Sequence, residues 1–205
     1  MRKVCATLVI FLIAGLGAFA QSRPQTLETV PLFPGATRNS TAEVEYNDDF
    51  STDRTVRVFT VNQAPEEVLA WYIKTLGSQS MDGMQGPPQI KVGMVSDSFH
   101  MINYLDEDSL EDGYADDRKT YEAKWIKDQL KANRKKSGEG YVDNAQFFWA
   151  YRKASSVYHQ FEMNIIDRTF TEYTTGNNAT GALPGKKIYR AQTDIVVVEQ
   201  ISKGN

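Results

Sequence analysis

The chain has 205 residues, of which 23 are basic, 26 are acidic and 41% are hydrophobic, and its formal net charge is −3. A chain of this length buries roughly 70% of its unfolded surface, which is enough for one self-sufficient core. The acidic balance argues against a nucleic-acid binder, which needs a basic face to release phosphate counterions, and against electrostatic attachment to anionic lipid.

Residues 1–20 have the three parts of a secretory signal peptide. Arg2 and Lys3 give a positive start, an apolar stretch follows, and Ala18-Phe19-Ala20 fits the small-x-small site of signal peptidase. The apolar stretch is shorter than the roughly 20 residues that span a bilayer, so we expect cleavage before Gln21 and no integral membrane segment afterwards. The sequence therefore predicts an extracytoplasmic protein, either periplasmic or secreted.

The residues after the cleavage site predict a short leader and one domain. Residues 21–29 are polar with one proline, and we expect them to form a flexible leader. Two prolines and Gly35 then favour a tight bend, at which order is expected to begin. We predict a single α+β domain over residues 30–203.

An aromatic-Pro-Gly-Ala element, Phe33-Pro34-Gly35-Ala36, opens this domain. A strand-like segment at 56–61 follows, and then a helix-like segment that starts Glu66-Glu67-Val68 and continues to Trp71-Tyr72 and Leu76. In these features the first third of the mature chain resembles a group of uncharacterised secreted bacterial proteins. The resemblance implies a secreted bacterial protein, and it carries no activity with it.

The residues themselves also predict this strand and helix. Residues 55–61 are rich in β-branched and aromatic side chains, which favour a strand. Pro65 suits the first position of a helix, and apolar residues recur at intervals of three and four up to Leu76. Gly77 can end the helix in the left-handed conformation.

The middle of the chain predicts a loop, a hairpin and a long helix. Residues 78–88 are rich in Gly, Met, Gln and Pro, which favours a loop. Residues 89–95 and 98–105 are expected to pair as a hairpin. An acidic run then leads into a helix from about residue 114 to 136, whose bases lie in the last turn, as the helix dipole prefers.

The last third gives the clearest strand signal. We predict strands at 147–151, 157–165 and 188–201, of which the second alternates apolar and polar residues. The order β-α-β-β-α-β is typical of a ferredoxin-like unit, here with extra strands, and a cystatin- or NTF2-like meander is an equal alternative. Both give an α+β fold with two helices packed on an antiparallel sheet. All three tryptophans are expected to be mostly buried: Trp71, Trp125 and Trp149.

Catalytic motifs are scarce in this sequence. Histidine-assisted hydrolysis in the mature chain must use His100 or His159, and a histidine on the apolar side of a strand is usually a core residue. Paired carboxylates need no sequence motif, so Glu162 and Asp194 are the other catalytic candidates. The glycine-rich segment at 181–187 has the wrong spacing for a phosphate loop.

Two groups of residues could ligate a metal ion. Asp108 and Asp112 lie in the acidic run and could attract calcium, but the run fails the EF-hand template. Met81, Met84 and His100 are of the types that suit Cu(I), although methionines in strands usually fill gaps in a core. We expect no metal site and no cofactor, and we predict that millimolar calcium leaves the melting temperature unchanged.

The strands carry more aromatic residues than a small sheet requires. Trp149 and Tyr151 share one face of their strand with Phe147, and Phe148 points to the other face. If one face of the sheet is open, Trp149, Tyr151 and Tyr158 are candidates for binding a hydrophobic or sugar-like ligand or a partner protein. If both faces are covered, these aromatic residues are part of the core. The sequence thus favours a non-enzymatic binding or interaction module, and the alternative is a hydrolase that acts on cell-envelope material.

Overall fold

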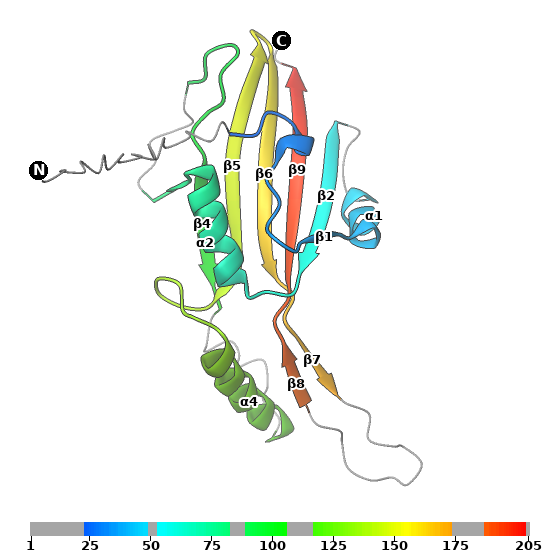
Figure 1. Cartoon of the computed structure of the whole chain (residues 1–205), viewed down its shortest axis with the longest axis vertical. Coiled ribbons are helices and arrows are strands. Elements are labelled where there is room, and N and C mark those ends of the chain that lie inside the picture. The colour runs from blue at the N-terminus through cyan, green and yellow to red at the C-terminus, as the bar shows by residue number, and fades with distance from the viewer. Residues whose placement is uncertain (1–22, 49–52, 83–88, 106–116, 174–186, 204–205) are drawn as a thin grey trace, which may run out of the picture.

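The structure is a computed structural model, and it describes residues 23–48, 53–82, 89–105, 117–173 and 187–203. Helices pack with a mostly antiparallel sheet (Figure 1), which confirms the predicted α+β class. In chain order the described elements are the 3₁₀ helix η1 (Leu27–Thr29), β1 (Thr37–Arg38), α1 (Ser40–Asp48), β2 (Arg54–Val61), α2 (Pro65–Leu76), β3 (Gln79–Ser80), β4 (Phe99–Tyr104), α4 (Asp117–Asn133), β5 (Val142–Ala154), β6 (Val157–Asp167), β7 (Phe170–Tyr173), β8 (Lys187–Arg190) and β9 (Thr193–Lys203). None of the helices described is both long and apolar enough to cross a membrane.

Seven of the described strands form one sheet in the order β1-β2-β9-β6-β5-β4-β3. Neighbouring strands are antiparallel except for the short parallel pair β3 and β4. Strands β6 and β9 form a long hairpin that continues beyond the sheet as the paired strands β7 and β8 (Figure 1). On its other side β9 pairs along its length with β2, so that β9 lies between an early and a late part of the chain.

The front face of the sheet, which faces the viewer in Figure 1, carries α2 and the main core. Val68, Leu69 and Tyr72 of α2 are fully buried there, against side chains such as Phe147 of β5 and Met163 of β6. The helix begins at Pro65 and ends where Gly77 adopts the left-handed conformation, with φ of 56°, as predicted. Burial of such an apolar helix face is the main force that holds α2 on the sheet.

The back face of the sheet is covered on one side by α1. Val56 and Val58 of β2 and Val196 of β9 form a second buried cluster, against which Ala42 and Tyr46 of α1 pack. Helix α1 was not predicted, because its residues have little amphipathic character. The signal that could have indicated it is Asn39, whose side-chain oxygen accepts a hydrogen bond from the backbone N–H of Ala42 at 3.1 Å as a helix N-cap.

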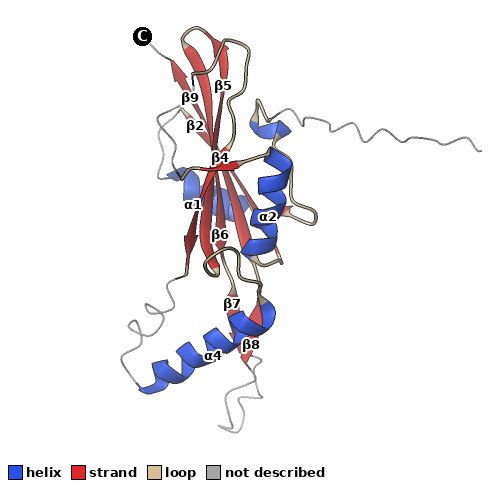
Figure 2. Ribbon diagram, turned by 90° about the vertical axis from the view of Figure 1, so that its left-hand side faces the viewer, coloured by secondary structure: helices blue, strands red, loops and turns tan. Residues whose placement is uncertain are grey.

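The long helix predicted at 114–136 is described from Asp117 onwards, and α4 does not lie on the sheet. It lies past the lower end of the sheet, beside β7 and β8 (Figures 1 and 2). Arg134, one residue after the helix, connects it to the core: its guanidinium lies 2.6 Å from the Glu66 carboxylate and 2.7 Å from that of Asp167. The side chain of Arg134 is completely buried, so α4 is fixed mainly at its carboxyl end.

Residues 23–29, expected to belong to a flexible leader, instead pack across the front face. The indole N–H of Trp149 donates to the carbonyl of Pro24 at 3.0 Å, and Leu27 is buried. The rings of Trp149 and Phe161 stack with their centroids 5.2 Å apart. This aromatic pair provides an apolar surface that the chain covers as it enters the domain.

The predicted hairpin between residues 89–95 and 98–105 does not form. The chain before β4 instead follows the edge of β5, where Gly93 N–H donates to Arg152 O and Ser96 N–H donates to Ala150 O. The reason is the length of β5, whose 13 residues offer a continuous edge for pairing. Of the tryptophans, Trp149 is buried, and the other two, Trp71 and Trp125, are half-buried.

Candidate ligand-binding site

The back face of the sheet contains a hollow between the part covered by α1 and the edge at β3. This hollow, here called the back-face trough, has a volume of about 570 Å³. Aromatic and aliphatic side chains make up most of its lining, with a few polar groups among them. The lining residues are Arg54, Met81, Ile90, Ser96, Asp97, Phe99, Phe148, Trp149, Ala150, Tyr158, Gln160, Phe161, Glu162, Val198 and Gln200.

The register of the strands sets the floor of the trough. Phe99, Phe148, Glu162 and Val198 are directly opposite one another across β4, β5, β6 and β9, so their side chains point to the same face. Because side chains alternate along a strand, Ala150 and its cross-strand neighbours form the next row on this face. The small side chain of Ala150 leaves space between larger neighbours.

The segment before β4 forms one wall of the trough. Ser96 is buried, and its hydroxyl accepts a hydrogen bond from the backbone N–H of Ala150 at 2.9 Å. The guanidinium of Arg152 donates to the carbonyl of Ile90 at 3.0 Å, and Asp97 forms a salt bridge with Arg23 at 2.9 Å. This wall is therefore tied both to β5 and to the first described residues of the chain.

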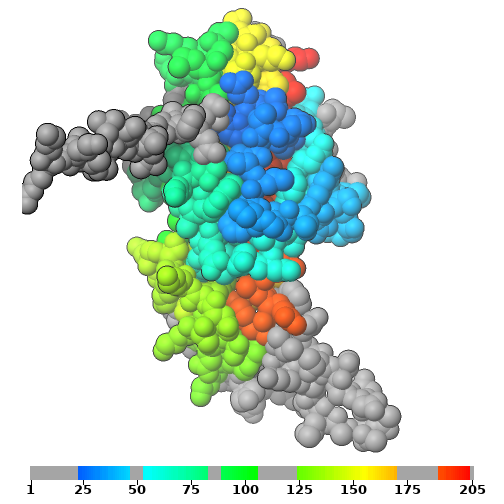
Figure 3. Space-filling model, viewed as in Figure 1, coloured from blue at the N-terminus to red at the C-terminus, as the bar shows by residue number. Residues whose placement is uncertain are grey.

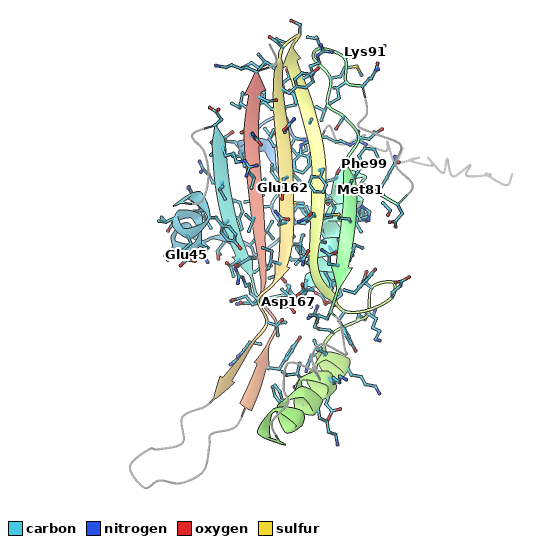
Figure 4. The ribbon with its side chains drawn as sticks, turned by 180° about the vertical axis from the view of Figure 1, so that it is seen from behind. Glu45, Met81, Lys91, Phe99, Glu162 and Asp167 are labelled. Carbon is cyan, nitrogen blue, oxygen red and sulfur yellow. The ribbon has the colours of Figure 1, made fainter. Side chains whose placement is uncertain are left out.

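Glu162 is the half-buried carboxylate on the floor of the trough. Figure 4 shows it on the central strand β6, on the same side of the sheet as Met81 and Phe99. Among the described residues, Asn164 Nδ2 donates to Glu162 Oε1 at 2.9 Å. Arg54, at the other side of the trough, donates to Gln200 Oε1 at 3.3 Å. The trough thus offers an acceptor of hydrogen bonds within mainly apolar surroundings.

The structure does not bring the predicted catalytic residues together. His159 lies on the front face, where its Nδ1 is 2.6 Å from Glu199 Oε1, whereas Glu162 lies on the back face. Asp194 is on the back face, but it lies four residues along β9 from Val198, the partner of Glu162, which is about 13 Å. The Asp194 carboxylate accepts hydrogen bonds from the Thr60 hydroxyl at 2.6 Å and from Arg168 Nε at 3.1 Å.

The aromatic candidates divide between the two faces. Trp149 is buried on the front face, so its ring is not an open platform, although the residue borders the trough. Tyr151 is half-buried on the same front face, with its ring 5.9 Å from that of His159. Tyr158 lines the trough, and the Arg152 guanidinium lies 5.2 Å from its ring centroid. Of the three candidates, Tyr158 alone presents its side chain on the face that forms the floor of the trough.

The metal candidates are also separated. His100 is buried on the front face, and its Nδ1 lies 3.1 Å from the Ser78 hydroxyl, while Met81 lines the trough. Asp108, Asp112 and Met84 lie outside the described residues, as does the glycine-rich segment 181–186. Within the described part of the chain, no cluster of three or more His, Cys, Asp or Glu side chains could hold a metal ion.

Most of the residues that form the trough were not predicted from the sequence. Phe99 and Phe148 have the signal of strand alternation, but this pattern alone does not say which face a helix will cover. Gln160 and Gln200 are polar residues at alternating positions and are usual on an exposed face. Ile90 comes from a segment whose predicted pairing was wrong.

Comparison of the chain with protein-family models, with curated proteins and with solved structures finds no match.

Proposed function

We propose that the protein is a non-enzymatic binding module that takes a small, largely apolar ligand into the back-face trough. The observation that carries this proposal is the trough itself, a hollow of about 570 Å³ lined by Phe99, Phe148 and Tyr158 with one half-buried carboxylate, Glu162. Small-molecule sites typically have volumes of about 300–1,000 Å³ and combine apolar walls with a few polar groups.

The polar groups of the trough support an amphiphilic ligand. Glu162 can accept a hydrogen bond or pair with a cation, and the amides of Gln160 and Gln200 add donors and acceptors nearby. The apolar part of the ligand would lie over Phe148 and Ala150. In this proposal the signal peptide at residues 1–20 directs the module out of the cytoplasm, where it meets its ligand.

A fluorescence titration with N-phenyl-1-naphthylamine, a neutral apolar probe, tests the proposal. The wild-type protein should bind the probe, and Ala150→Phe, which fills the trough, should weaken binding at least tenfold. Ala132→Phe adds the same side chain at an exposed position on α4 and should bind as the wild type does. Equal binding by all three proteins would contradict the proposal. So would turnover of an envelope-type substrate that is lost in Glu162→Gln.

A further inference from the structure

One part of the floor of the back-face trough is polar. Gln160 and Glu162 are successive back-face residues of β6, and Gln200 of β9 lies directly opposite Gln160. Alternate residues along a strand are about 7 Å apart and neighbouring strands about 5 Å apart, so these three side chains start from one small area of the sheet. Gln160, Glu162 and Gln200 are here called the polar corner.

The other part of the floor, on the side of β4, is apolar. Phe148 of β5 is directly opposite Glu162, and Phe99 of β4 is directly opposite Phe148. Figure 4 shows Phe99 and Met81 on this side of the sheet, two strands away from Glu162. The space-filling view in Figure 3 shows that α2 and the first described residues cover the front of the sheet, so a ligand meets both parts of the floor from the back. The trough can thus hold an amphiphile across the strands.

The polar corner has hydrogen-bonding groups that the described part of the chain does not satisfy. Asn164 Nδ2 donates to Glu162 Oε1 at 2.9 Å, whereas no described residue donates to Glu162 Oε2. The Gln160 amide likewise has no hydrogen-bond partner among the described residues. Gln200 accepts from Arg54 through Oε1, which leaves its Nε2 group as a donor. The corner therefore offers both donors and acceptors to a ligand.

The charge and the hydrogen-bonding groups of the corner favour a neutral head group with hydroxyls. The Glu162 carboxylate repels a phosphate or a carboxylate. A cationic head group could pair with Glu162, but it has no acceptor for the amide N–H groups of Gln160 and Gln200. A hydroxyl both donates and accepts, so a head group with several hydroxyls can satisfy the carboxylate and both amides together.

We propose that the ligand of the trough is an amphiphile with a sugar head group, which binds at the polar corner. This inference rests on the proposed function, because it names the class of ligand that the same trough takes. The sugar hydroxyls donate to the Glu162 carboxylate and accept from the two amides, and these bonds include a charged acceptor, which makes them stronger. The apolar C–H face of the sugar ring packs against Phe148, and the alkyl chain extends over Phe99.

Displacement of N-phenyl-1-naphthylamine by two neutral detergents, each below its micelle concentration, tests the head group. Octyl glucoside and tetraethylene glycol monooctyl ether have the same alkyl chain, but the ether head group has one hydroxyl where the sugar has several. The glucoside should displace the probe from the wild-type protein at an about tenfold lower concentration, which is the effect of one or two additional hydrogen bonds.

Gln160→Met removes an amide of the polar corner and keeps the length of the side chain. The ratio between the two displacing concentrations should therefore fall by about threefold or more in this variant. The matched control is Gln146→Met, the same substitution on the same face of β5 at a residue that does not line the trough, and it should keep the ratio of the wild type. Neither glutamine is fully buried, so both variants should melt close to the wild-type temperature.

Three results separate this inference from the proposed function. If the probe binds and the two detergents displace it equally from the wild type, the sugar head group is wrong and the binding module stands. A ratio that is unchanged in Gln160→Met, or reduced equally in Gln146→Met, has the same meaning. If the wild type does not bind the probe at all, the proposed function fails, and this inference fails with it.

Discussion

Glu162 sets the preference of the trough at the scale of single residues. Asp97 is exposed and paired with Arg23, so Glu162 is the half-buried carboxylate that a ligand in the trough would meet. Dodecylamine should therefore displace the naphthylamine probe at a lower concentration than dodecanoate does. Glu162→Gln removes the carboxylate charge, and this difference should shrink in competition titrations. If Glu162→Gln kept the same preference for dodecylamine over dodecanoate, the charged head group of the ligand would lie away from Glu162.

His100 gives a prediction about pH. Burial lowers the pKa of His100 from its ordinary value of 6.5, with the charge of Asp82 opposing the shift. The unfolded chain then binds a proton near pH 6.5 that the folded chain does not, so this histidine makes stability fall as pH decreases through 6.5. Urea midpoints measured from pH 7.5 to 5 should show a smaller decrease in His100→Gln than in the wild type. An identical pH dependence would contradict this account.

Among the elements, α4 depends on one buried ion cluster. Arg134 donates to Glu66 and Asp167 and also to the carbonyl of Val142 at 2.5 Å. Burial alone would lower the pKa of Arg134, but its hydrogen bonds to the Glu66 carboxylate and the charge of Asp167 raise it, so the group stays charged. Removing one member of such a cluster leaves the others buried without compensation.

Arg134→Ala should therefore destabilise the protein by about 3–5 kcal/mol, measured by urea unfolding. The exposed neighbour Lys135→Ala is the matched control and should change stability little. Hydrogen exchange should also show faster exchange of the α4 amides in Arg134→Ala, because the helix loses its link to the core. A loss below 1 kcal/mol would mean that other contacts hold α4 in place.

The sequence predicts elements well where local signals agree with tertiary packing. Strand β2 and helix α2 have both propensity and one buried face, and they lie where they are predicted. The position of α4 cannot be predicted from local signals, because it depends on the contact between Arg134 and Glu66, which are 68 positions apart in the sequence. The predicted strand at 188–201 is divided into β8 and β9 because the hairpin leaves the main sheet near Gln192.

The candidate site was predictable only in part for the same reason. The alternation of residues 147–151 correctly separates Phe148 from Phe147, Trp149 and Tyr151. The alternation does not show which face is covered. In the structure, α2 and the first described residues cover the face that carries Trp149, and Phe148 on the other face lines the trough. Glu162 was named as a catalytic candidate from its residue type, whereas the proposal that it contacts a ligand comes from its surroundings in the trough.

At the scale of the whole molecule, export remains a prediction from the first 20 residues. Cleavage after Ala20 should give a product that starts at Gln21, and N-terminal sequencing of the protein expressed with its full sequence in a bacterial host checks this. Replacing Ala18 and Ala20 with bulky residues should block processing at this site. A product that retains Met1, recovered only with integral membrane proteins, would contradict the prediction.

The position of β9 in the sheet also has a consequence for the order in which the protein can fold during synthesis. Strand β2 is made early, yet β9, the strand that lies between it and β6, starts only at Thr193. Until β9 is available, β2 has no partner on that side, and the side chains of Val56 and Val58 lack the β9 valines against which they are buried. Strands β4, β5 and β6 can therefore pair before β9 is present, and the sheet is completed only when β9 joins it.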